Sequence, residues 1–305
     1  MEIKLAVEIG KLKLKNPVTV ASGTFGYAEE FTDFLDLKKL GAIVTKTITL
    51  KSRKGNPGPR TCETPAGLLN SIGLENPGLE EFISCNLPVF KKTGVPVIVS
   101  IASEADPAEF VELASRLDKT DGVAAVELNI SCPNIKGKSN LISQDPVATY
   151  DLVKAVRAVT QKTLITKLSP NVTSITEIAK AAQEAGSDAL ALINTITGMS
   201  IDIRERRPRI ASIIAGLSGP AIRPVAVRMV WEVYRQVKIP LIGMGGIMNV
   251  DDALEFFIAG ATAVSVGTGN FVNPGASVEI IAGLKKYMVK SGINDIKDII
   301  GSLKI

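Results

Sequence analysis

The run Ala124-Ala125-Val126-Glu127-Leu128-Asn129-Ile130 is apolar at five of its seven positions. Such a run is typical of a parallel strand that is covered on both faces, whereas a half-exposed strand alternates apolar and polar residues. Similar runs recur along the chain. The predicted strands are residues 18–22, 42–47, 97–102, 124–130, 164–168, 189–194, 241–244 and 263–267.

Amphipathic segments of helical length lie between these strands, among them residues 106–117, 146–160, 175–185 and 250–258. Glycine can adopt the left-handed conformation that closes a helix. Glycines of this kind precede several predicted strands, at Gly41, Gly94, Gly122, Gly186 and Gly260. Eight βα units without a break in composition predict an α/β fold, a single (β/α)8 TIM barrel over residues 1–305. An open, doubly wound sheet is the alternative, since counting strands does not prove closure.

The sequence also predicts an N-terminal β-hairpin, with strands at residues 3–9 and 12–14 and a turn at Gly10-Lys11. Long loops follow strands 2, 4 and 6, and the first and last of these are residues 48–75 and 196–221. Usual connections have about two to six residues. Because the active site of such a barrel lies at the carboxyl ends of its strands, we expect these loops to cover a substrate. A structural excursion over the barrel is the alternative.

Composition excludes several classes of function. The chain contains no histidine, which removes Ser-His-Asp triads, Cys-His pairs and histidine-ligated metals and leaves acid–base work to Cys, Lys, Asp, Glu or Tyr. Cys62, Cys85 and Cys132 lie far apart, so we expect no metal site and no iron–sulfur cluster in this chain. A net charge of +4 does not suggest nucleic acid. No apolar stretch approaches the roughly 18 residues of a membrane-spanning helix, so we expect a cytoplasmic protein.

Glycine-rich segments follow the seventh and eighth predicted strands, and another precedes the sixth helix. In phosphate-binding barrels, glycines at these places let backbone N–H groups approach the anion. Each segment alone is common in turns, but together and in this order they predict a phosphate site. They are Gly243-Met244-Gly245-Gly246-Ile247, Val266-Gly267-Thr268-Gly269 and Gly216-Leu217-Ser218-Gly219-Pro220.

Polar side chains cluster at the carboxyl ends of other predicted strands. Lys46 and Lys167 lie within apolar strand ends, where a buried ammonium is costly without an anionic or electron-rich partner. Asn129 and Asn194 can both donate and accept, which suits a flat ligand with alternating C=O and N–H edges. Cys132 follows the fourth strand, and modest electrostatic assistance would make its thiol a competent base. A structural Ser-Cys-Pro turn is the alternative for Cys132.

On these segments the chain resembles the class 1 dihydroorotate dehydrogenases, and within that family the B-type catalytic subunits. The resemblance extends over essentially the whole chain. Its most specific segments are Asn56-Pro57-Gly58-Pro59-Arg60, Glu63-Thr64-Pro65, Asn70-Ser71-Ile72-Gly73-Leu74-Glu75-Asn76-Pro77-Gly78, Glu127-Leu128-Asn129-Ile130-Ser131-Cys132-Pro133-Asn134 and Gly216-Leu217-Ser218-Gly219-Pro220-Ala221.

The resemblance implies that FMN lies across the barrel mouth and that dihydroorotate stacks on it. The implied flavin contacts are Ser22, Lys46, Thr47, Asn129, Lys167, Ile193 and Gly219, with the phosphate on Gly245, Gly246, Gly267 and Thr268. The implied substrate contacts are Lys46, Asn70, Ser71, Ile72, Gly73, Leu74, Asn129, Asn194 and Thr195. Cys132 would take the C5 proton while C6 gives hydride to the flavin, which yields orotate for pyrimidine biosynthesis.

The resemblance further implies a partner subunit that carries FAD and a [2Fe-2S] cluster and passes electrons to NAD⁺, in a heterotetramer of two catalytic and two electron-transfer subunits. The residues agree, because the scattered cysteines cannot ligate a cluster and no strand–GxGxxG–helix unit offers a dinucleotide site. The run of Arg204, Arg206, Arg207 and Arg209 is a candidate rim for docking this partner, or an ordinary solvated loop.

One position departs from the family. Relatives commonly offer an asparagine to FMN where this chain has Ser100, and a serine can keep one hydrogen bond or leave it to water. Three alternative functions stay open: an A-type homodimeric enzyme that reduces fumarate, a flavin-free barrel with a Schiff-base lysine at Lys46 or Lys167, and a barrel retained only for binding or assembly.

Overall fold

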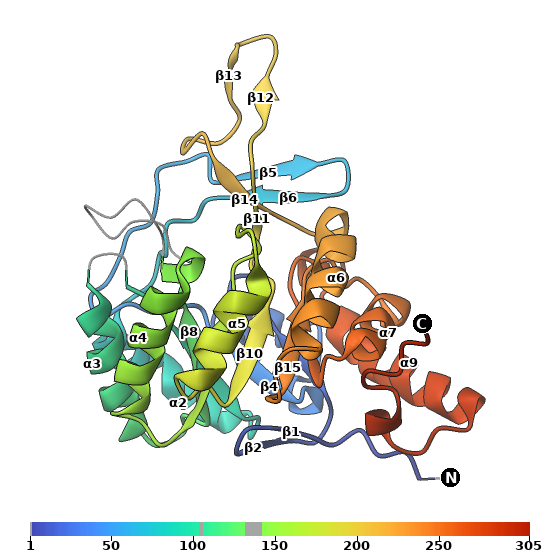
Figure 1. Ribbon diagram of the computed structural model, residues 1–305. Helices are drawn as coiled ribbons and strands as arrows, with labels where there is room; N and C mark the ends of the chain where they lie inside the picture. Colours follow the sequence, from blue (N-terminus) through green and yellow to red (C-terminus); the bar gives the residue numbers. More distant parts are fainter. Residues whose placement is uncertain (1, 104–105, 132–141) are drawn as a thin grey trace.

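The computed structural model describes residues 2–103, 106–131 and 142–305. Within these residues, eight parallel strands close a barrel in the order β10-β15-β16-β3-β4-β7-β8-β9 (Figure 1). Closure confirms the predicted TIM barrel and excludes the open sheet. The strands are β3 (Val18–Val20), β4 (Ala42–Val44), β7 (Val97–Ile101), β8 (Ala125–Asn129), β9 (Thr163–Lys167), β10 (Ala189–Leu192), β15 (Leu241–Met244) and β16 (Ala263–Val266).

Helices surround the barrel and bury their apolar faces against its strands. The four predicted helices are confirmed to within three residues at each end. The α-helices are α1 (Leu79–Glu81), α2 (Leu87–Lys92), α3 (Pro107–Asp118), α4 (Pro146–Arg157), α5 (Ile175–Glu184), α6 (Arg223–Tyr234), α7 (Val250–Ala259), α8 (Gly269–Val272) and α9 (Ala276–Ser291). Single turns of helix are η1 (Glu29–Phe31), η2 (Leu37–Lys39), η3 (Phe82–Asn86), η4 (Ile142–Gln144), η5 (Pro220–Ile222) and η6 (Ile296–Asp298). No helix in the described ranges is long and apolar enough to span a membrane.

The predicted N-terminal hairpin is present and lies at the end of the barrel opposite the long loops (Figure 1). It consists of β1 (Val7–Ile9) and β2 (Leu12–Leu14), which pair antiparallel. The backbone N–H of Lys11 in the turn donates to Thr163 Oγ1 at the start of β9 (3.1 Å). The first strand is shorter than predicted because Lys4 pairs with Asp295 near the C-terminus and not with the second strand of the hairpin.

The long connections after the second and sixth barrel strands join in one antiparallel sheet above the barrel mouth, which we call the lid sheet (Figure 1). Its order is β11 (Ile196–Gly198), β14 (Ala215–Ser218), β6 (Gly67–Asn70) and β5 (Thr61–Thr64). A ribbon of β12 (Ile201–Asp202) and β13 (Arg207–Pro208) projects from it. Leu69, Ile210 and Ala215 form a small separate core. These connections are therefore more regular than the loops that the sequence predicted.

One glycine was assigned the wrong cause. Gly94, Gly122, Gly186 and Gly260 adopt positive φ, as predicted for residues that end helices. Gly41 does not belong to the positive-φ set. A Cβ there would collide with the carbonyl oxygen of Asn16, so the close approach of two backbone segments requires this glycine.

Candidate active site

Polar side chains meet where β7, β8 and β9 end. Asn129 and Lys167 are the last residues of β8 and β9 and are paired in register. Ser100 on β7 is paired with Glu127 on β8. Since residues two apart in a strand point to the same face, Glu127 and Asn129 share a face. All four side chains are buried, and Glu127 is only 1% exposed.

Hydrogen bonds connect Glu127 to the segment after β4. The Ser100 hydroxyl donates to Glu127 Oε1 (2.9 Å), and Ser100 Oγ lies 3.0 Å from Thr47 Oγ1. Ser100 is therefore bonded to Glu127 of the neighbouring strand and to Thr47 in the segment after β4.

The same hydrogen-bond network extends from Thr47 through Asn129 to the segment after β10. Asn129 Nδ2 donates to Thr47 Oγ1 (3.5 Å), and Asn194 Nδ2 donates to Asn129 Oδ1 (3.2 Å). The backbone N–H of Thr195 donates to Asn194 Oδ1 (2.8 Å). The structure thus brings together four of the predicted contacts, from three different barrel strands.

The two predicted lysines differ in their surroundings. Lys167 is 6% exposed, and its ammonium makes no hydrogen bond or ion pair in the described part of the chain. Enclosing most of a charged side chain without a partner costs free energy, so this position favours an electron-rich or anionic ligand beside the ammonium. Lys46 is half-buried, and its backbone N–H donates to the carbonyl of Gly26 in the loop after β3 (3.2 Å).

Glycines form the other side of the mouth. Gly245 and Gly246 follow β15 with φ of 122° and 80°, and Gly219 follows β14 with φ of 93°. Thr268 follows β16, and its hydroxyl donates to Ser218 Oγ of the lid sheet (2.7 Å). The nearest atoms to a Cβ on Gly267 would be Ala21 Cβ at 3.8 Å and Thr24 Oγ1 at 4.0 Å. The backbone beside Gly267 is therefore open to a ligand.

The remaining predicted residues divide into those at the mouth and those in the lid. Ser22 and Ile193 follow β3 and β10 and are buried at the mouth. Asn70 ends β6, and its Nδ2 donates to the carbonyl of Gly216 (3.3 Å), whose Cα packs against the Thr195 side chain.

The segment from Ser71 to Leu74 bonds mainly to the neighbouring part of its own connection. The backbone N–H of Ser71 donates to the carbonyl of Arg60 (2.8 Å), and Asn56 Nδ2 donates to Ser71 Oγ (2.8 Å). The carbonyl of Ile72 accepts from the backbone N–H of Asn56 (2.9 Å). In the described structure this segment makes no hydrogen bond to the polar residues of the mouth.

The predicted base, Cys132, lies outside the described residues. Tyr27, in the loop after β3, is another side chain with acid–base chemistry near the mouth. Burial, with smaller contributions from Glu30, Glu81 and Glu75, raises the pKa of Tyr27 to about 12. The phenol therefore stays protonated at neutral pH and is a poor base.

Sequence reasoning assigned no role to Glu127 or to Ser218. Glu127 was visible as a charged residue inside an apolar strand, two positions before Asn129 on the same face. That pattern marks a polar network in a barrel interior, because a buried carboxylate needs donors. Ser218 gave no comparable signal, since its partner Thr268 is 50 residues away.

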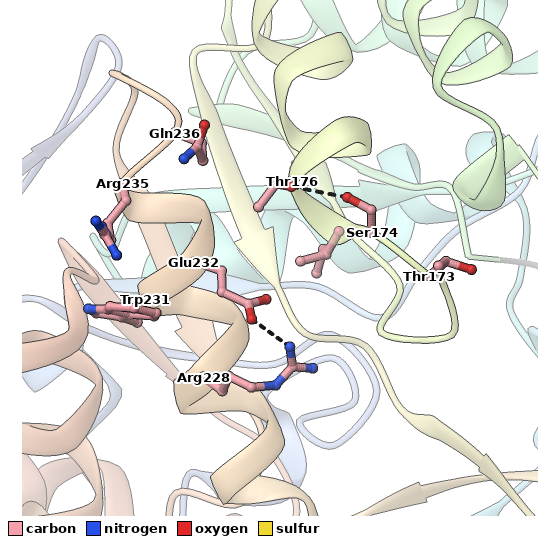
Figure 2. A pocket seen from close by; sticks show the side chains of 9 residues that line it. Thr173, Ser174, Thr176, Arg228, Trp231, Glu232, Arg235 and Gln236 are labelled. Atoms are coloured by element: carbon pink, nitrogen blue, oxygen red, sulfur yellow. Dashed lines mark hydrogen bonds and ion pairs between the residues drawn. The ribbon is translucent and has the colours of Figure 1, made fainter.

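A cavity of about 340 Å³ lies away from these residues, between the start of α5 and one face of α6 (Figure 2). Arg228 in its wall pairs with Glu232 (2.7 Å), and the Arg235 guanidinium lies 4.8 Å from the centre of the Trp231 ring. None of its lining residues was a predicted site residue. Both arginines thus have partners within the wall.

Comparison with known proteins identifies the family of this chain. The sequence model of the family described as dihydroorotate dehydrogenase matches residues 4–288. A protein of Trichlorobacter lovleyi is 55% identical over 304 residues, which is 100% of both chains. Proteins of Geotalea daltonii and Desulforamulus reducens are 54% and 53% identical, over 99% of this chain and 98% and 99% of theirs.

All three relatives bear the same name, dihydroorotate dehydrogenase B (NAD(+)), catalytic subunit. The alignments cover nearly the whole of each protein, so the similarity extends over the barrel, the lid sheet and the mouth. The resemblance to the B-type catalytic subunits is confirmed, and the chain belongs to the dihydroorotate dehydrogenase family.

Proposed function

We propose that this chain oxidises dihydroorotate to orotate, with FMN bound across the mouth of the barrel. The observation that carries the proposal is the position of Lys167, a largely buried side chain whose ammonium has no partner in the described part of the chain, beside Asn129 and at the same end of the barrel as the glycine segments. This arrangement suits an elongated ligand that has an electron-rich ring at one end and a phosphate at the other. Membership of the dihydroorotate dehydrogenase family supports the same reaction.

The residues present fit a flavin. An open approach to the backbone at Gly267 and an unpaired cation on the largely buried Lys167 are features that FMN would satisfy. We assign its ring and ribityl chain to Ser22, Lys46, Thr47, Asn129, Lys167, Ile193 and Gly219, and its phosphate to Gly245, Gly246, Gly267 and Thr268. When bound, FMN would supply the two-electron acceptor that the reaction requires.

The chain's own groups would hold the substrate and move its proton. Amide N–H groups of Asn129 and Asn194 suit the carboxylate and carbonyl oxygens of dihydroorotate, and the Lys46 ammonium suits its negative charge. Asn70, Ser71, Ile72, Gly73, Leu74 and Thr195 complete the assigned substrate contacts. The Cys132 thiolate accepts the proton from C5 while the C6 hydrogen leaves as hydride, so that the C5–C6 bond becomes double.

Replacement of the base tests this proposal. We expect Cys132→Ala to bind FMN as the wild type does, but to reduce it roughly 10²–10⁴-fold more slowly when dihydroorotate is added without oxygen. The decrease in flavin absorbance, followed by stopped-flow spectroscopy, gives the rate of flavin reduction. Cys85→Ala is the matched control, because Cys85 is an exposed free cysteine on η3, outside the assigned site, and it should reduce FMN at the normal rate.

Two results would contradict this scheme. Unchanged flavin reduction by Cys132→Ala at neutral pH would eliminate the base assignment. A purified wild-type chain that holds no flavin would eliminate the flavin itself, and would favour the Schiff-base alternative, which borohydride trapping on Lys46 or Lys167 would detect.

We further propose that electrons leave through a partner subunit that carries FAD and a [2Fe-2S] cluster, in a cytoplasmic heterotetramer of two catalytic and two electron-transfer subunits. The name of the relatives supports an NAD⁺-linked enzyme that needs a second subunit. The arginine run lies on and beside the projecting β12–β13 ribbon, next to Ile203, which is 83% exposed. Arginine with exposed apolar residues is typical of protein interfaces. The ribbon could therefore form an interface with a second copy of this chain or with the electron-transfer subunit.

A reconstitution assay tests the partner. We expect the isolated chain to reduce its flavin with dihydroorotate but to form no NADH, and we expect NADH once the electron-transfer subunit is added. Absorbance at the NADH band measures the product. NADH formation by the isolated chain would refute the partner, and turnover with fumarate in its absence would move the assignment to the A-type.

A further inference from the structure

The hydrogen bonds at the mouth form a chain whose two ends have fixed roles. At one end the backbone N–H of Thr195 can only donate, and at the other the Glu127 carboxylate can only accept. The Ser100 hydroxyl has one hydrogen, which it gives to Glu127. At the 3.0 Å contact between Ser100 Oγ and Thr47 Oγ1, Thr47 must therefore be the donor. In every hydrogen bond of this series, the donor therefore lies on the Thr195 side and the acceptor on the Glu127 side.

This direction decides how the two amides are turned. Thr47 has given its only hydrogen to Ser100, so it must accept from Asn129, which requires Asn129 to face it with Nδ2. The Oδ1 atom of Asn129 then accepts from Asn194 Nδ2. The two ends of an amide have nearly the same size and shape, so packing alone does not choose between these orientations. Each Nδ2 keeps a second hydrogen that the chain does not use.

We propose that Glu127 is a positioning residue that anchors one end of these hydrogen bonds, and that together with the Thr195 N–H at the other end it holds Asn129 and Asn194 so that both offer N–H donors to the substrate. The inference rests on the proposed function for the identity of the ligand, whose carboxylate and carbonyl oxygens need such donors. Glu127 does not touch the ligand in this account. It acts through Ser100 and Thr47.

Calorimetric titration of the purified, flavin-loaded protein with orotate tests the inference without relying on turnover. We expect Ser100→Ala, which breaks the link between Thr47 and Glu127, to weaken orotate binding about tenfold, since Asn129 is then held from the Asn194 side alone and Thr47 is left without its acceptor. Glu127→Leu should do the same. Glu127→Gln keeps an acceptor oxygen and should recover part of the affinity. The double variant Ser100→Ala, Glu127→Gln should bind no more weakly than Ser100→Ala alone, because the link is already cut.

Ser265→Ala is the matched control. Ser265 is as fully buried as Ser100, and its hydroxyl has no hydrogen-bond partner among the described residues. It should bind orotate like the wild type. In rapid-reaction experiments, the Ser100 and Glu127 variants should raise the KM for dihydroorotate more than they lower the maximal rate of flavin reduction. A general loss of folding would not produce this difference.

The outcomes separate the two proposals. Failure of the wild-type protein to bind orotate would refute the proposed function. Tight binding by the wild type, with Ser100→Ala indistinguishable from Ser265→Ala, would refute only the role of Glu127. Additive losses in the double variant would also refute it, because Glu127 would then act by a route that does not pass through Ser100. If Glu127→Leu fails to fold, Glu127→Gln and Ser100→Ala still decide the question.

Discussion

The two sides of the barrel mouth present different chemistry. Around β7, β8 and β9 the groups that we assign to the ligand are side chains, joined by hydrogen bonds that end at Glu127. Around β15 and β16 the groups that we assign to the phosphate are backbone N–H donors in the glycine segments after these strands. Side-chain chemistry can be changed one group at a time with the backbone intact. Backbone donors can be altered only through the conformation or the bulk of the residues that carry them.

Within the glycine side, two residues that look equivalent in sequence are required for different reasons. Gly246 has φ of 80°, and a Cβ there would lie 2.8 Å from the carbonyl oxygen of Gly219. Gly267 lacks a positive φ, and its Cβ would meet nothing closer than 3.8 Å. The fold itself therefore requires glycine at 246. At 267 the fold does not, so our assignment of the FMN phosphate to this backbone predicts that a side chain there would disturb the ligand and not the fold.

Replacing each of these two glycines with alanine should separate a requirement of the fold from a requirement of the ligand. The larger loss of stability is expected for Gly246. We expect Gly246→Ala to lower the free energy of unfolding by roughly 1–3 kcal/mol and to lose FMN, because the backbone is strained with or without a ligand. Gly267→Ala should leave thermal unfolding of the flavin-free protein unchanged and weaken FMN binding by about tenfold or more. Calorimetry and flavin fluorescence titration measure the two quantities.

Full FMN affinity in Gly267→Ala would place the phosphate elsewhere. Equal losses of stability in both variants would mean that position 267 is constrained by the fold in the same way as position 246. A loss of flavin in Gly246→Ala alone carries little information about the phosphate site, since the unfolding of that loop explains it equally well.

Much of the barrel was predictable because its signals are local. Residues 97–102 were predicted as a strand, and β7 is Val97–Ile101. The lid sheet was not predicted, because β6 pairs with β14 and the hydrogen bond from Asn70 to Gly216 joins residues 146 positions apart. Short, half-exposed strands such as β5 do not bury enough apolar surface to leave a pattern in sequence.

The same limit applies to the site. Strand-end positions were predictable, so Lys167, Asn129 and the glycines lie together as expected at one end of the barrel. Hydrogen-bond partners across strands were not predictable, because they depend on register. The contact between Thr47 and Ser100, for example, joins β7 to the irregular segment after β4. The role of Glu127 became visible only through that contact.

The smallest predicted effect concerns Lys167, on the side of the mouth formed by β7, β8 and β9. It is a gain in stability, whereas Gly246→Ala should lose stability. Lys167→Met should raise the free energy of unfolding of the flavin-free protein by about 1 kcal/mol, because it replaces an unpaired ammonium on a largely buried side chain with an apolar chain of similar length. The same variant should bind FMN more weakly, since the cation that faces the flavin is gone. Lys180→Met, at an exposed position on α5, is the matched control and should change neither quantity. A loss of stability in flavin-free Lys167→Met would show that Lys167 supports the fold, and would remove the buried cation as an argument for a ligand.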